Sequence, residues 1–128
     1  MALTKTSPTQ IGSVSGLASG SSYTSSSFDV SDAVACEIEV VISASATPDP
    51  SKGSVDIEIY ESQDGSNFGD DPIYTATTQP DATSWRAHFP ANVITSKTIC
   101  VVVKNNLKDS SDAGISADFT INAIKTTV

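Results

Sequence analysis

The chain is short of positive charge. Seven of its 128 residues are lysine or arginine, against 15 aspartates and glutamates, which gives a formal net charge of −8. The basic residues are scattered along the sequence without a cluster. Nucleic acids and anionic membrane surfaces are bound through clustered basic side chains. We therefore expect neither a nucleic-acid partner nor a membrane partner.

Cysteine and histidine are also scarce. With two cysteines and one histidine, the chain has neither a disulfide framework nor the ligand spacing of a zinc site. His88 falls on the polar side of an alternating segment, and the sequence contains no Gly-x-Ser-x-Gly motif. These shortages predict a protein that is not an enzyme and that carries no cofactor.

Acidic residues gather in two loops, and carboxylate oxygens are good calcium ligands. The two groups are Asp64 to Asp71 and Asp109 to Asp112. Neither has the ordered ligand positions of an EF-hand loop. We expect these carboxylates to be solvated parts of turns, and no metal site is predicted.

No part of the sequence is apolar for long. The N-terminal stretch Met1–Pro8 lacks the apolar run of a signal peptide. No segment approaches the roughly 18 consecutive apolar residues that a membrane span needs. We expect a soluble protein made in a cytoplasm.

What the chain does have is a repeated alternation of apolar and polar residues. In Cys36–Ile42 and Val55–Ile59 every second residue is apolar, which is the period of a half-buried strand. Turn residues separate such segments. The pattern predicts an all-β antiparallel β-sandwich of about seven to eight strands, with jelly-roll and immunoglobulin-like topologies both open. The expected core is Ile38, Val40, Ile42, Val55, Ile57, Ile59, Trp85, Phe89, Ile99, Val101, Val103, Phe119 and Ile121.

The first 21 residues are different in character. They are rich in Gly and Ser, and their apolar residues Ile11, Val14 and Leu17 recur three apart. Such a segment cannot bury enough surface to fold alone. Residues 1–21 are therefore predicted to be a flexible arm, or a strand that needs a partner, ahead of a β-sandwich domain at residues 22–128. We expect the arm to reach an adjacent subunit, so that its removal would leave the melting temperature nearly unchanged.

Two valines lie on the opposite side from the main apolar row of their strands. These are Val41 and Val102. If both sides of a strand are apolar, something must cover the second side. Together with Ile11, Val14 and Leu17, the two valines are the candidate partner-binding residues, and they favour self-association as a dimer or trimer.

A strand leads into Ser62-Gln63-Asp64-Gly65-Ser66-Asn67-Phe68, and Ser84-Trp85-Arg86 and a valine-rich strand follow. This arrangement resembles the small β-sandwich virion proteins of tailed bacteriophages, notably capsid decoration or cement proteins. The resemblance implies a virion structural protein that binds the outside of an assembled phage shell and bridges capsid subunits. Its partner would be the major capsid protein or another virion protein.

A second class of function stays open, namely a carbohydrate- or receptor-binding β-sandwich module of the tail-fibre or adhesin type. Sugar sites usually present exposed aromatic rings. Tyr23, Tyr60 and Tyr74 are the candidates, with Tyr60 and Tyr74 on the polar faces of their strands. Aromatic residues make up only 6% of the chain, which favours the virion interpretation over a sugar platform.

The two cysteines are predicted to be unlinked. Cys36 falls with the core face of its strand, whereas Cys100 falls opposite Ile99 and Val101. The intact mass measured under non-reducing conditions should be that of a chain with free thiols. A mass lower by a pair of hydrogens would show a disulfide.

Overall fold

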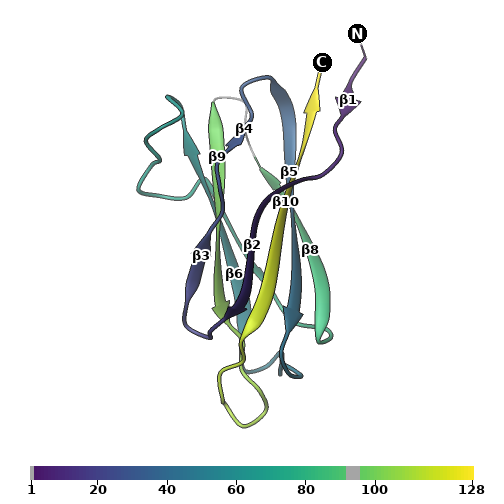
Figure 1. Ribbon diagram of the computed structural model, residues 1–128, viewed down its shortest axis with the longest axis vertical. Coiled ribbons are helices and arrows are strands. Elements are labelled where there is room, and N and C mark those ends of the chain that lie inside the picture. The colour runs from purple at the N-terminus through teal and green to yellow at the C-terminus, as the bar shows by residue number, and fades with distance from the viewer. Residues whose placement is uncertain (1, 92–95) are drawn as a thin grey trace.

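Two antiparallel sheets packed face to face make up residues 2–91 and 96–128, the part that the computed structural model describes (Figure 1). The predicted all-β sandwich is confirmed. The structure has ten strands rather than seven to eight, because the N-terminal segment contributes two and the segment from residue 22 to 29 is split. The strands are β1 (Thr4–Lys5), β2 (Thr9–Leu17), β3 (Ser22–Thr24), β4 (Phe28–Asp29), β5 (Ala33–Ala44), β6 (Ser54–Ser62), β7 (Tyr74–Thr78), β8 (Ser84–Ala91), β9 (Thr98–Asn106) and β10 (Ala117–Thr127).

The strand order is that of a jelly roll. Sheet A runs β2–β10–β5–β8, and sheet B runs β3/β4–β9–β6–β7. Strand β1 pairs with the C-terminal end of β10, on the same side of β10 as β2. The chain is a long hairpin rolled over on itself, since β6 pairs with β7, β5 with β8, β3 and β4 with β9, and β2 with β10. With β3 and β4 counted as one interrupted strand, this is the eight-stranded jelly roll rather than the immunoglobulin-like alternative.

Sequence alternation correctly predicted most of the core. All of the expected core residues are buried except Phe89, which is half-buried against the core. Val30, Leu107 and Ile115, from the connections between strands, complete the interior. Pro90 does not end β8, which runs on to Ala91. Because β8 lies at a sheet edge, the missing N–H of this proline need not break a ladder bond.

The N-terminal segment is not a flexible arm. Residues 9–17 form β2, which pairs with β10 of the same chain. Ile11 is only 6% exposed, and Val14 and Leu17 pack against the core. The partner that this strand needs is therefore internal. Removing residues 1–21 would take β2 away from sheet A and uncover part of the core, so the expectation now changes to a lowered melting temperature for the truncated chain.

The spacing of the apolar residues in β2 follows from its irregular pairing. The register with β10 shifts between Ala117 and Phe119, and again between Ile121 and Asn122. Each shift is a bulge that inserts one extra residue into β2. A bulge brings residues three apart, such as Val14 and Leu17, to the same face of the sheet. Gly12 fits the same strand closely, since a Cβ there would lie 2.9 Å from the ring of Tyr23.

A buried amide joins the N-terminal segment to the interior. Asn105 on β9 has no exposed surface. Its Nδ2 donates hydrogen bonds to the carbonyl oxygens of Leu17 at 2.8 Å and Ile115 at 2.9 Å, and its Oδ1 accepts one from the amide of Leu107 at 2.9 Å. The side chain thus satisfies three backbone groups, one at the end of β2 and two in the connection between β9 and β10. Such full pairing is the condition for a polar group to be tolerated in a core.

Asn105→Ala should lower the free energy of unfolding by about 2–4 kcal/mol, because it leaves buried backbone groups unpaired. Urea unfolding measures the change. Asn106→Ala is the matched control: Asn106 is exposed, and its side chain donates one hydrogen bond, to Asp56 at 3.1 Å. Equal losses for the two variants would contradict the role given to Asn105.

Candidate functional site

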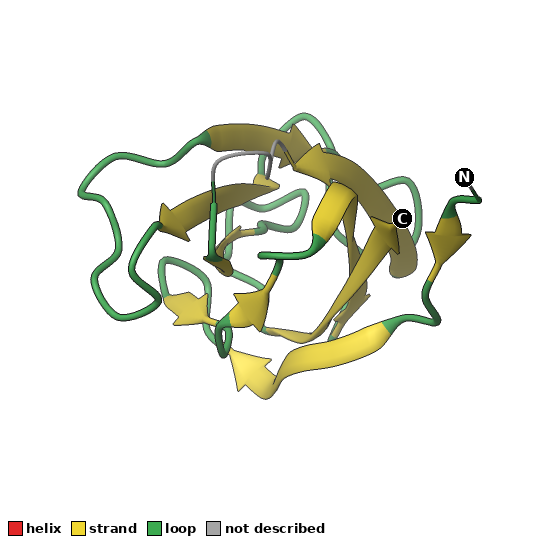
Figure 2. Cartoon of the chain, turned by 90° about the horizontal axis from the view of Figure 1, so that it is seen from above, coloured by secondary structure: helices red, strands yellow, loops and turns green. Residues whose placement is uncertain are grey.

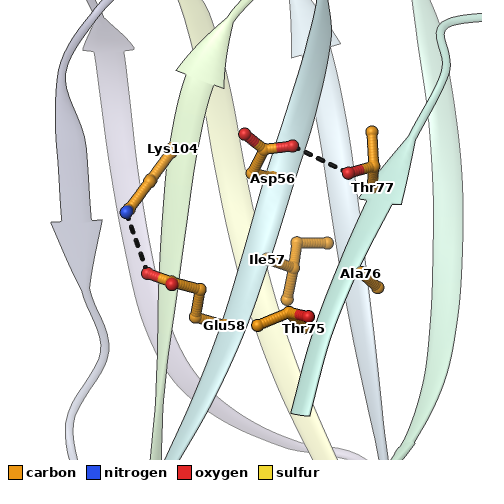
Figure 3. A pocket seen from close by; sticks show the side chains of 7 residues that line it. All are labelled: Asp56, Ile57, Glu58, Thr75, Ala76, Thr77 and Lys104. Atoms are coloured by element: carbon orange, nitrogen blue, oxygen red, sulfur yellow. Dashed lines mark hydrogen bonds and ion pairs between the residues drawn. The ribbon is translucent and has the colours of Figure 1, made fainter. Parts of the chain in front are cut away.

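The outer face of sheet B carries a shallow polar groove of about 420 Å³. Figure 3 shows it crossing β9, β6 and the edge strand β7. On one side the ammonium group of Lys104 lies 3.0 Å from a carboxylate oxygen of Glu58. On the other side the hydroxyl of Thr77 donates a hydrogen bond to Asp56 at 2.8 Å. The groove is therefore lined by side chains that already pair across strands.

The remaining polar groups of this groove are also engaged. Tyr60 donates a hydrogen bond to Glu58 at 3.2 Å. The hydrogen bond and charge of Glu58 raise the pKa of Lys104, which favours the charged form of the lysine. Paired, half-exposed side chains of this kind are typical of a solvated face of an antiparallel sheet.

The three tyrosines do not form a platform for a sugar. Tyr60 points outward, as predicted. Tyr74 was expected on the polar face but points inward, where its ring lies 6.4 Å from that of Phe89. Tyr23 is half-buried against the core, and its hydroxyl accepts a hydrogen bond from the amide of Ser13 at 3.2 Å. The alternation over residues 73–77 misleads because Ala76 and Tyr74, not the threonines, share the face of Ile57 and Ile59.

On the outer face of sheet A, one carboxylate contacts three polar side chains from the neighbouring strands. Glu39 accepts a hydrogen bond from Asn122 at 2.9 Å and lies 3.3 Å from Arg86 and 3.4 Å from His88. The hydrogen bond from Asn122, with the charge of Arg86, lowers the pKa of Glu39. His88, on the outward side as predicted, is thus one member of a cross-strand polar cluster.

Val41 and Val102 sit singly among polar neighbours. Val41 is opposite Thr120 and Arg86 in the ladders of sheet A. Val102 is opposite Thr24 and Glu58 in sheet B. Both are half-buried. Ile11, Val14 and Leu17 serve the chain's own core, so the five candidate partner-binding residues are not brought together on one surface.

The aspartates of the loops stabilise turns. In four places the Oδ1 of an aspartate accepts a hydrogen bond from the amide of a serine two residues later, an Asx turn. The distances are 2.9, 2.9, 2.8 and 2.8 Å for Asp29–Ser31, Asp49–Ser51, Asp64–Ser66 and Asp109–Ser111. The repeated Asp-x-Ser pattern is a signal of turns that the sequence contains.

Asp64 holds the most elaborate of these turns. Its carboxylate accepts hydrogen bonds from the amide and side chain of Asn67, the amide of Ser66 and the hydroxyl of Ser62, all between 2.8 and 2.9 Å. The backbone of Asn67 is the main reason that the pKa of Asp64 lies well below its ordinary value. Across residues 2–91 and 96–128, no group of three or more acidic, histidine or cysteine side chains is placed to hold a metal ion.

Exposed large apolar side chains occur at one end of the sandwich. Within the described part of the chain they are Leu3, Val34 and Val128, which are 68%, 46% and 60% exposed. The register places them together, since Thr4 pairs with Thr127 and Thr127 in turn with Ala33. Figure 1 shows both termini at this end, and Figure 2 shows the N-terminal strand standing off the body of the sandwich. We call Leu3, Val34 and Val128 the apolar end.

Two ion pairs lie near the apolar end, one formed by Lys5 and the other by Lys125. Lys5 lies 2.5 Å from Glu37, across the C-terminal part of β10. Both residues line a cleft of about 220 Å³, together with Ala35 and Ile124. Lys125 reaches 2.7 Å from Asp32 and lies 5.6 Å from the centre of the Phe28 ring. Since Phe28 belongs to sheet B, Lys125 ties the two sheets together at this end.

The apolar end was not among the surfaces predicted from the sequence. Its three residues lie outside the regular alternation, and two of them are near the chain termini, where apolar residues carry little signal. The pairing of β1 with the end of β10 is what brings them together. A jelly roll pairs the first strands with the last, so this fold would have indicated that the two ends of the chain meet.

No family model matches the sequence, and no curated protein shows significant sequence similarity to it. Among solved structures, the SPBc2 prophage-derived protein YomS is similar, with 15% identity, 99% of this chain and 96% of that chain covered, and a TM-score of 0.51. This likeness shows a shared fold.

Two further solved structures are less similar. One is of Bacillus endospore appendages, described as disulfide-linked pili, with 13% identity, coverage of 99% of this chain and 88% of that chain, and a TM-score of 0.45. The other is the Yersinia pseudotuberculosis-derived mitogen, with 11% identity, coverage of 99% and 86%, and a TM-score of 0.42. Neither bears on what this chain does.

Within the described residues, no helix has the length and apolarity required to cross a membrane.

Asp64→Ala should destabilise the protein at neutral pH and should do so less in acid. Hydrogen bonds lower the folded-state pKa of Asp64 below its value in the unfolded chain, so its contribution is present above the unfolded pKa and is lost as pH falls through the folded pKa. Urea unfolding at about pH 7 and about pH 3 should show the wild-type advantage shrinking. Gln63→Ala, a change at an exposed neighbour whose side chain does not titrate, should show no such dependence on pH.

Proposed function

We propose that the chain is a non-enzymatic virion structural protein, a capsid decoration or cement protein that binds the outside of an assembled phage shell through its apolar end. The observation that carries this proposal is the clustering of Leu3, Val34 and Val128. These are the large apolar side chains that the described residues leave exposed. Exposed apolar residues that lie together mark interaction surfaces, whereas single ones are ordinary.

The two sheet faces are poor docking surfaces, which also favours docking through the apolar end. The outer face of sheet A is closed by the cluster around Glu39, and that of sheet B by the pairs at Asp56 and Glu58. Burying such charged pairs in an interface would cost desolvation that their attraction does not reliably return. A protein that docks by burying apolar surface therefore docks end-on, with both sheet faces left in water.

The small size of the apolar end fits binding in many copies. Three side chains bury far less than the roughly 1,200–2,000 Å² of a stable protein interface. On a shell with repeated sites, a dimer or trimer engages several sites at once, and linked binding raises the overall affinity without new contacts. We therefore include homo-oligomerisation, and a major capsid protein or another virion protein as partner, in the proposal.

The fold is compatible with this role without selecting it. Jelly rolls occur in viral capsid and lectin domains alike. A shared fold does not transfer function, so the prophage-derived neighbour adds no more than architecture. The competing function is a carbohydrate- or receptor-binding module. It has less support, because the three tyrosines do not share a surface.

The proposal is tested on phage particles released by the source cell. Particles purified on a density gradient should contain the chain, and immunogold labelling should place it on heads. Labelling on tail fibres would favour the receptor-binding alternative. Absence of the chain from particles would refute a virion role.

A second arm of the experiment tests the apolar end. Shells from a strain lacking the gene should bind added wild-type protein. The variant Leu3→Ser/Val34→Ser/Val128→Ser should bind at least about a hundredfold more weakly, since each of the three apolar groups contributes on the order of 1 kcal/mol when buried. The matched control Val41→Ser/Val102→Ser changes half-buried valines on the sheet faces and should bind like the wild type.

A further inference from the structure

The four sheet edges of the sandwich differ in how they are protected. Three of them carry features that prevent a further strand from pairing. Natural sheets protect edges with charged side chains, proline, bulges or short interrupted strands, because an unpaired row of N–H and C=O groups accepts any extended chain. The fourth edge, β7, has none of these features except its short length.

Edge β8 is protected by its side chains. Arg86 and His88 are exposed on it, and Pro90 supplies no N–H. On the opposite side of sheet A, β2 carries two bulges. Its free side is occupied as well, since the amide of Ser26 donates a hydrogen bond to the carbonyl of Ile11 at 2.8 Å. The β3/β4 edge faces β2 and is interrupted at Ser25, whose hydroxyl accepts a hydrogen bond from the amide of Val101.

Strand β7 is regular and uncharged. Its sequence is Tyr-Thr-Ala-Thr-Thr, and all five residues pair with β6 without a register shift. Outside this ladder, the described residues make no backbone hydrogen bond to residues 74–78. Threonine has a high preference for strands. The free side of β7 is therefore a straight, unblocked row of backbone groups.

An apolar seam runs beside this free edge. Between β7 and β8 the two sheets are joined by side chains: the indole N–H of Trp85 donates a hydrogen bond to Thr78 at 3.1 Å, and Tyr74 packs with Phe89. Tyr74, Phe89 and Ile73 are half-buried against the core. A strand added to β7 would cover these side chains with every second residue of its own.

Charge around the edge indicates what kind of strand fits. Asp70 and Asp71 precede β7 and Asp81 follows it, and all three are exposed. A second copy of β7 paired antiparallel would bring Asp70 and Asp71 against Asp81 of the other copy. Like charges so placed disfavour that pairing, in a chain whose net charge is −8. A segment with basic flanks is attracted at both ends.

We propose that β7 is a strand-acceptor edge, which binds an extended segment of another protein in which apolar residues alternate with polar ones between lysine or arginine flanks. Backbone pairing supplies the register and the covered seam supplies apolar burial, as in strand addition generally. This site lies on a side edge of the sandwich, and it does not depend on the apolar end or on a place in a virion.

The test uses the full chain and a synthetic peptide, Lys-Lys-Val-Thr-Val-Thr-Val-Lys-Lys. Calorimetry should detect binding, and amide hydrogen exchange should slow at residues 74–78. A peptide with Glu in place of every Lys should bind about tenfold more weakly, as expected for charges at a rim. A peptide N-methylated at alternate residues should not bind, because it cannot form the ladder.

A protein variant checks the charge argument separately. Asp70→Asn/Asp71→Asn/Asp81→Asn removes the flanking charges without touching β7 and should abolish the preference for Lys over Glu peptides. Asp112→Asn, an equal kind of change at an exposed aspartate in another loop, should retain it. The proposal is overturned by an absence of binding at millimolar peptide, by protection at another strand, or by equal binding of the Lys and Glu peptides. It is also overturned if residues 74–78 are protected by self-association without peptide, since the occupant is then a second copy.

Discussion

The structure depends on pairing between the two ends of the chain. Strand β10 hydrogen-bonds to β1 and β2 on one side and to β5 on the other. Without it, sheet A would lose its centre, and the Gly- and Ser-rich N-terminal segment would lose the strand with which β1 and β2 pair. Closing such long loops is entropically costly, and the cost is recovered only when the non-local pairs form. The same pairing places both termini, and the apolar end, at one point on the surface.

Asn105 shows how the rolled sandwich is held in register. Its amide connects the end of β2, the start of the loop after β9 and Ile115 at the end of that same loop. A buried polar side chain that is fully satisfied favours one arrangement over its competitors, because any slip leaves its partners unpaired. At the other end, Lys125 joins β10 to Phe28 and Asp29 of β4. The two contacts fix opposite ends of the same interior.

Much of the fold could be predicted from the sequence, and the reasons for the failures are physical. Period-two alternation assigned the inward faces of β5 and β6 correctly, because straight strands preserve that period. It failed for β2, where bulges convert the spacing to three. It failed for Tyr74, because the short edge strand β7 has too few residues to define its phase. The candidate surface could not be predicted, since the apolar end is assembled from the two termini and the start of β5.

Many of the acidic residues have structural roles in turns and between strands. Asp29, Asp49, Asp64 and Asp109 accept hydrogen bonds inside turns, and Glu39 and Glu58 take part in cross-strand pairs. These carboxylates shape the loops and the sheet faces, and the end of the sandwich is the surface that we propose for docking to a shell. Electron cryomicroscopy of shells decorated with the chain tests that conclusion most directly. The account predicts that Leu3, Val34 and Val128 meet the shell while both outer sheet faces remain in solvent. Contact through the face of sheet A or sheet B, with the apolar end in solvent, would contradict it.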